Sequence, residues 1–78
     1  MKEIVNEREI PINTSFIRLD ALLKMTGAAQ TGGQAKILVQ TGRVLVNGQV
    51  CLMRGKKLVN GDLVQAADED VCYRVTQA

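Results

Sequence analysis

Apolar residues recur at helical spacing in two segments of the first half of this chain. The first segment places four of them on one helical face: Phe16, Leu19, Leu22 and Leu23. Thr14 and Ser15 are good N-cap residues ahead of this stripe, and Gly27 is suited to end the helix. The pattern predicts a helix over about residues 16–26 whose apolar face, Phe16 included, packs into the core.

The second segment predicts a helix over about residues 32–41. Thr31 and Gln34 have the spacing of a capping box, in which side chains accept hydrogen bonds from the N–H groups at a helix start. Gly42 is placed to end the helix. Its apolar stripe has three members: Ala35, Leu38 and Val39.

From residue 43 the pattern becomes that of strands. Val44 and Val46 occupy alternate positions, and Asn47-Gly48 predicts a tight type I′ turn into a strand over residues 49–52. Further short strands are expected over residues 8–13, 58–59, 63–67 and 71–76. The sequence therefore predicts an α+β fold, in which two N-terminal helices pack on a small, mainly antiparallel sheet.

The composition fits one small globular domain spanning residues 1–78. Apolar residues make up 46% of the chain and charged residues 23%, which allows a single core and does not favour disorder. Residues 1–9 carry charges where a signal peptide would be apolar, and no apolar run approaches the roughly 20 residues of a membrane span. We therefore expect a monomeric, cytoplasmic protein.

The residues of common catalytic and metal sites are scarce. The chain has no histidine, and its only serine, Ser15, stands at the expected helix start. Residues 68–70, Asp-Glu-Asp, are interpreted as a solvated turn between strands, and Cys51 and Cys72 as reduced, half-buried strand residues. We expect no enzymatic activity, no metal and no cofactor.

Positive charge is concentrated in the middle of the chain. Between Arg18 and Lys57 the only carboxylate is Asp20, whereas the remaining carboxylates lie in the flanking segments. The cations of this region are Arg18, Lys24, Lys36, Arg43, Arg54, Lys56 and Lys57. Such segregation creates a positive field that attracts polyanions, although any one of these side chains can serve solubility alone.

Aromatic residues narrow the kind of nucleic acid that would fit. Only Phe16 and Tyr73 are aromatic, and Phe16 is assigned to the core stripe of the first helix. We therefore expect no platform for stacking successive unpaired bases, which disfavours single-strand binding modes. The remaining mode is recognition of the phosphates and shape of folded RNA by basic side chains and helix N-termini.

Gly32 and Gly33 fit that mode, because a bare backbone lets a phosphate approach the N–H groups at a helix start. Each glycine costs about 1 kcal/mol of helix propensity relative to alanine. A flexible helix entry or a tight packing contact with the first helix would explain the two glycines equally well.

A set of residues in consistent order carries a family resemblance. These residues are Arg18-Leu19-Asp20, Leu23, Thr31, Ala35, Gly42, Val44, Val46-Asn47-Gly48, Gly61-Asp62 and Val64. Over about residues 17–64 the chain resembles the RNA-binding domain of the ribosomal protein S4 type, also called the alpha-L motif. Residues 33–36 and 54–57 are most similar to the short stand-alone bacterial proteins of the YaaA/YbcJ type.

The resemblance implies an RNA-binding face, with one departure from the family pattern. Family members commonly begin the second helix with Ser-Arg, whereas Thr31-Gly32 stands here, so the cap is kept and the charge is lost. Lys24 and Lys36 are candidate substitutes. Carried over by position, the face comprises Arg18, Lys24, Gly32, Gly33, Lys36 and Arg43, with the loop cations Arg54, Lys56 and Lys57 beside it.

Two functions of different classes remain open. The resemblance implies a protein that binds structured RNA, with ribosomal or ribosome-associated RNA as the expected partner. The alternative is a protein-interaction adaptor that uses the same basic face against an acidic partner. A salt titration with RNA and with an acidic competitor protein would separate the two.

Overall fold

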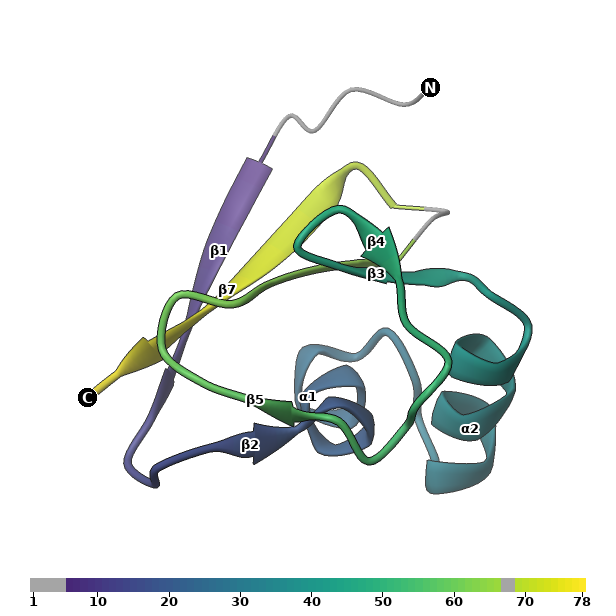
Figure 1. The fold of residues 1–78 in the computed structure, drawn as a ribbon, viewed down its shortest axis with the longest axis horizontal. Coiled ribbons are helices and arrows are strands. Elements are labelled where there is room, and N and C mark those ends of the chain that lie inside the picture. The colour runs from purple at the N-terminus through teal and green to yellow at the C-terminus, as the bar shows by residue number, and fades with distance from the viewer. Residues whose placement is uncertain (1–5, 67–68) are drawn as a thin grey trace.

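The computed structural model describes residues 6–66 and 69–78 (Figure 1). In chain order its elements are β1 (Asn6–Ile12), β2 (Ile17–Arg18), α1 (Leu19–Thr26), α2 (Gly32–Gln40), β3 (Val44–Val46), β4 (Gln49–Val50), β5 (Lys57–Leu58), β6 (Leu63–Ala66) and β7 (Val71–Gln77). The α+β class is as expected. The helices are not N-terminal, however, because β1 and β2 precede them.

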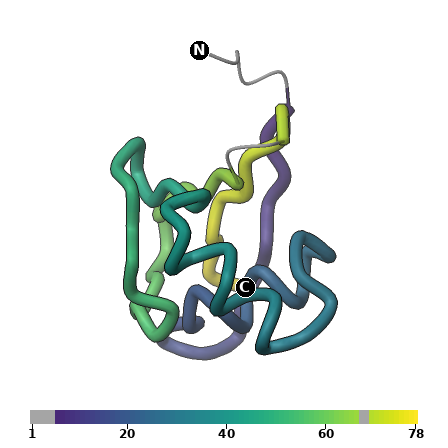
Figure 2. The backbone as a smooth tube through the Cα atoms, turned by 90° about the vertical axis from the view of Figure 1, so that its right-hand side faces the viewer, coloured from purple at the N-terminus to yellow at the C-terminus, as the bar shows by residue number. Residues whose placement is uncertain are grey.

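The sheet is mainly antiparallel, as expected, but it is mixed because one edge pair is parallel. Its strand order is β1-β7-β6-β3-β4, and β2 and β5 form a separate two-stranded ribbon. β1 runs parallel to β7, whereas the other neighbouring strands are antiparallel. Figure 2 shows β1 and β7 side by side, although almost the whole described chain separates them. No local turn signal predicts such a distant pairing, so the sequence pattern missed it.

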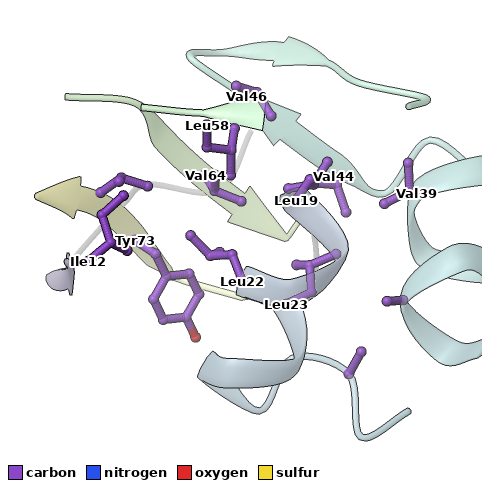
Figure 3. Close-up of a cluster of buried hydrophobic side chains, with 13 residues drawn as sticks. Ile12, Leu19, Leu22, Leu23, Val39, Val44, Val46, Leu58, Val64 and Tyr73 are labelled. Carbon is purple, nitrogen blue, oxygen red and sulfur yellow. The ribbon is translucent and has the colours of Figure 1, made fainter. Parts of the chain in front are cut away.

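Both helices bury one side against the sheet in a common core (Figure 3). Leu19, Leu22 and Leu23 of α1 are fully buried together with Val44 of β3 and Val64 of β6. Burial of one leucine side chain contributes about 1.5–3 kcal/mol, so the leucine face is sufficient to hold α1 on the sheet.

α1 begins at Leu19, three residues later than the apolar stripe predicts. The backbone N–H groups of Leu19 and Asp20 donate to the carbonyl oxygens of Lys56 and Arg54, each at 2.9 Å. These tertiary hydrogen bonds replace a side-chain cap, and Arg18 at the N-cap position makes none. The expectation that Thr14 and Ser15 cap this helix is therefore wrong.

The local signals further along the chain predicted the structure well. Thr31 Oγ1 accepts a hydrogen bond from the Gln34 N–H at 3.1 Å, and Gln34 Oε1 accepts one from the Gln30 N–H at 2.8 Å. Asn47 and Gly48 both have positive φ, 52° and 83°, as a type I′ turn requires. The start of α2 and the β3–β4 hairpin are thus confirmed.

Candidate nucleic-acid interface

The β2–β5 ribbon presents charge on one side and apolar groups on the other. Ile17 pairs with Leu58 and Arg18 pairs with Lys57 in its antiparallel register. Leu58 is fully buried and Ile17 packs against the core, whereas Arg18 and Lys57 are exposed. Because side chains alternate along a strand, Phe16 belongs to the exposed side together with Arg18 and Lys57.

Arg18 is held in position although it is exposed. Its Nη2 lies 3.2 Å from Asp20 Oδ2, and 54% of its side chain is accessible to solvent. Asp20 Oδ1 in turn accepts a hydrogen bond from the Ala21 N–H at 2.8 Å. The guanidinium lies against Gly55, where an added Cβ would stand 3.3 Å from Nη2. Gly55 therefore leaves space for Arg18, whose position is set by two neighbouring segments.

The loop between β4 and β5 brings two more cations, Arg54 and Lys56, to this ribbon. The carbonyl groups of Arg54 and Lys56 accept the N–H groups at the start of α1, which ties the loop backbone to the helix. The side chains of Arg54, Lys56 and Lys57 point away from the core and are exposed. We call Arg18, Arg54, Lys56 and Lys57 the ribbon cluster.

The start of α2 is the second feature that can receive an anion. Among the described residues, no acceptor is present for the N–H groups of Gly32 and Gly33. A Cβ at Gly32 would meet nothing within 4 Å, and one at Gly33 only Thr31 Oγ1 at 3.8 Å. A tight packing contact with α1 therefore does not explain the two glycines. Their N–H groups lie at the positive end of the helix dipole, and no side chain of the glycines themselves covers them.

The predicted site residues fall into three regions. The ribbon, the β5 end of the β4–β5 loop and the first turn of α2 lie at the same end of the molecule, the lower end in Figure 1. Lys36 is exposed one turn after Gly32, and Lys24 is exposed in the last turn of α1. Arg43 follows the opposite end of α2, where its N–H donates to the Leu38 carbonyl at 3.1 Å. The structure therefore separates Arg43 from the ribbon cluster.

Phe16 is the residue that the sequence pattern misplaced. It lies outside α1 with 37% of its surface exposed, and the Lys57 Nζ stands 4.8 Å from the centroid of its ring. The expectation that Phe16 belongs to the core is wrong, and so is the argument that this excludes a stacking surface. Phe16 and Ile17 are both apolar, so no alternation of apolar and polar residues marked Phe16 as part of a strand.

Tyr73, the other aromatic residue, belongs to the core. Its hydroxyl donates to Glu69 Oε2 at 2.9 Å, and burial followed by this hydrogen bond raises the pKa of Tyr73. Cys72 is also buried, and burial raises the pKa of its thiol, whereas Cys51 is half-buried after β4. Both cysteines are free thiols. Neither they nor Tyr73 contribute to the basic surface.

The described residues form neither a grouped set of metal ligands nor a helix able to span a membrane. Within residues 6–66 and 69–78, no three His, Cys, Asp or Glu side chains are grouped to hold a metal ion. No helix in that same part of the chain is long and apolar enough to cross a membrane. Asp68 of the expected acidic turn lies outside the described residues, whereas the carboxylate of Glu69 accepts the hydrogen bond from the Tyr73 hydroxyl.

Two comparisons with known proteins agree with this picture. The family model described as "S4 domain" matches residues 10–76, which is most of the chain. A protein of Bacillus subtilis (strain 168) is 41% identical over 56 residues, which cover 72% of this chain and 79% of that protein. Its name is "Probable ribosome maturation protein RlbA".

Proposed function

Because this chain belongs to the S4 domain family, we propose that it is a single, non-catalytic domain that binds structured RNA. The observation that carries the proposal is the ribbon cluster, in which cations from β2, β5 and the β4–β5 loop converge beside the start of α1. Exposed cations on a backbone that is tied to α1 suit the phosphates of a folded RNA, whose positions are fixed.

The ribbon cluster and the start of α2 would contact different phosphates. Arg18 offers a planar guanidinium that can donate two hydrogen bonds to one phosphate, and the lysines act as point charges. Gly32 and Gly33 offer backbone N–H groups to a further phosphate. Lys24 and Lys36 extend this surface along the two helices, and Arg43 contributes at its far end.

Ribosomal RNA is the partner that we propose. The name of the Bacillus subtilis relative concerns ribosome maturation, and the family comparison supports an RNA partner for this chain. We therefore propose that the domain engages ribosomal RNA or a ribosomal particle in the cytoplasm. The alternative is an adaptor for acidic proteins, which would use the same cations but would not depend on the three-dimensional shape of an RNA.

Binding measured by fluorescence anisotropy tests the proposal. Labelled ribosomal RNA hairpins should bind more tightly than oligo-U of equal length. With about four to six cations engaged, the slope of log K against log salt should be roughly −3 to −5. A slope near zero, equal binding of oligo-U, or equal competition by polyglutamate would overturn it.

A further inference from the structure

We infer that Phe16 and Lys57 form a subsite for one unpaired nucleotide of the bound RNA, an inference that rests on the proposed RNA binding. The base stacks on the Phe16 ring, and Lys57 and Arg18 contact the phosphates on either side of it. The site would thus recognise a bulged or terminal base next to a double helix.

The ring is presented to solvent by the backbone around it. Thr14 Oγ1 donates to the Phe16 carbonyl oxygen at 2.8 Å, and the next residue, Ile17, packs inward against the core. Because neighbouring residues of an extended chain point to opposite sides, the inward Ile17 directs Phe16 outward. The exposed position of the ring is therefore a property of the fold.

The cations beside the ring are placed for phosphates that flank a base. Lys57 Nζ lies 4.8 Å from the ring centroid, and Arg18 is paired with Lys57 across the ribbon. An exposed contact between an ammonium and a ring is weaker than the stacking of a base on an aromatic side chain. A nucleotide can therefore take the ring face while Lys57 moves to its phosphate.

A nucleotide fits this surface better than a protein segment would. Lys57 places positive charge over the Phe16 ring, Arg18 stands opposite Lys57 in the ribbon, and the carboxylate of Asp20 is already bonded to Arg18. An unpaired nucleotide offers both an aromatic face and an anion within one residue. One ring gives one stacking position, which agrees with a preference for folded RNA over long single strands.

Two hairpins with the same stem test the inference, one fully paired and one with a single bulged 2-aminopurine. The wild type should bind the bulged hairpin about tenfold more tightly and quench its 2-aminopurine fluorescence. Phe16→Leu should lose both effects and still bind the paired hairpin within about twofold of wild type. Phe16→Tyr should retain both effects.

Val50→Ala is the matched control, because Val50 is an exposed apolar residue of β4, which belongs to the five-stranded sheet and not to the ribbon. It should bind both hairpins as the wild type does, and thermal melts should show every variant folded. Equal affinity of the wild type for the two hairpins without quenching would overturn the subsite and leave RNA binding intact. Failure of the wild type to bind either hairpin would overturn the proposed function itself, and the subsite with it.

Discussion

Asn47 and Asp62 join two turns of the chain, with Asn47 Nδ2 donating to Asp62 Oδ1 at 3.1 Å. Asp62 Oδ2 also accepts the Val59 N–H at 2.9 Å, and Asn47 Oδ1 accepts the Leu63 N–H at 3.0 Å. The β3–β4 turn is thereby fixed to the turn that precedes β6. These two residues carry part of the family resemblance, and their role in the structure is to hold the sheet together.

Replacing Asp62 should therefore lower stability without altering RNA binding. Asp62→Ala removes the acceptors of two hydrogen bonds, and we expect the free energy of unfolding to fall by about 1–3 kcal/mol in urea titrations. Asp70→Ala removes the same charge from an exposed position and should change the free energy of unfolding by less than about 0.5 kcal/mol. A larger loss of RNA affinity than of stability in Asp62→Ala would contradict this role.

Gly32→Ala should raise the stability of the domain and weaken its binding of RNA. Nothing lies within 4 Å of the added Cβ, so helix propensity should raise the free energy of unfolding by up to about 1 kcal/mol. The methyl group should hinder the approach of a phosphate and weaken hairpin binding by roughly threefold. Anisotropy and urea titrations measure the two effects. A variant that is more stable and binds equally well would show that the α2 start takes no part.

Reversing Lys56 and Lys57 to glutamate should weaken hairpin binding at least tenfold, about 1.4 kcal/mol, because phosphates would meet repulsion in place of attraction. The domain should stay folded, since the loop is tied to α1 through its backbone carbonyl groups. Thermal melts and anisotropy together test both statements.

The control for this reversal compares two single variants of equal charge change. Lys56→Glu alters the ribbon cluster, whereas Arg8→Glu alters an exposed position of β1, outside that cluster. We expect several-fold weaker binding for Lys56→Glu and little change for Arg8→Glu. Equal losses would mean that total charge, and not a local site, governs RNA affinity.

Tyr73 should make the domain sensitive to alkaline pH. Burial first, and then the hydrogen bond to Glu69, raises the pKa of Tyr73 above the ordinary value of 10.0. The unfolded chain therefore loses the Tyr73 proton at a lower pH than the folded chain does. The contribution of the Tyr73 hydroxyl to the free energy of unfolding is complete below about pH 10 and declines as the pH rises further. Urea midpoints measured across this range should fall less steeply for Tyr73→Phe. Parallel curves for the two proteins would refute the assignment.

The parts of the fold that depend on neighbouring residues could be predicted from the sequence. The capping of α2 by Thr31 and the Asn47-Gly48 turn follow from side chains within a few positions of each other. The start of α1 could not be predicted in this way, because its N–H groups bond to the carbonyls of Arg54 and Lys56. Those acceptors are more than thirty residues away in the sequence.

The candidate site shows the same division. The cations of the candidate site were identified from the sequence because basic residues are concentrated between Arg18 and Lys57. Which of these cations are neighbours in space depends on the pairing of β2 with β5. Phe16 was misplaced because its spacing to Leu19 and Leu23 also suits a helix. Only the tertiary structure shows that Phe16 lies outside α1.

The parallel pairing of β1 with β7 has a consequence for synthesis on the ribosome. In the described sheet β1 has β7 as its one strand neighbour, so residues 6–12 have no partner strand until residues 71–77 have been translated. The hairpin and the two helices can form earlier, because their contacts are more local. A nascent chain that stalls before β7 should therefore expose β1 as an unpaired strand that is open to protease cleavage or aggregation.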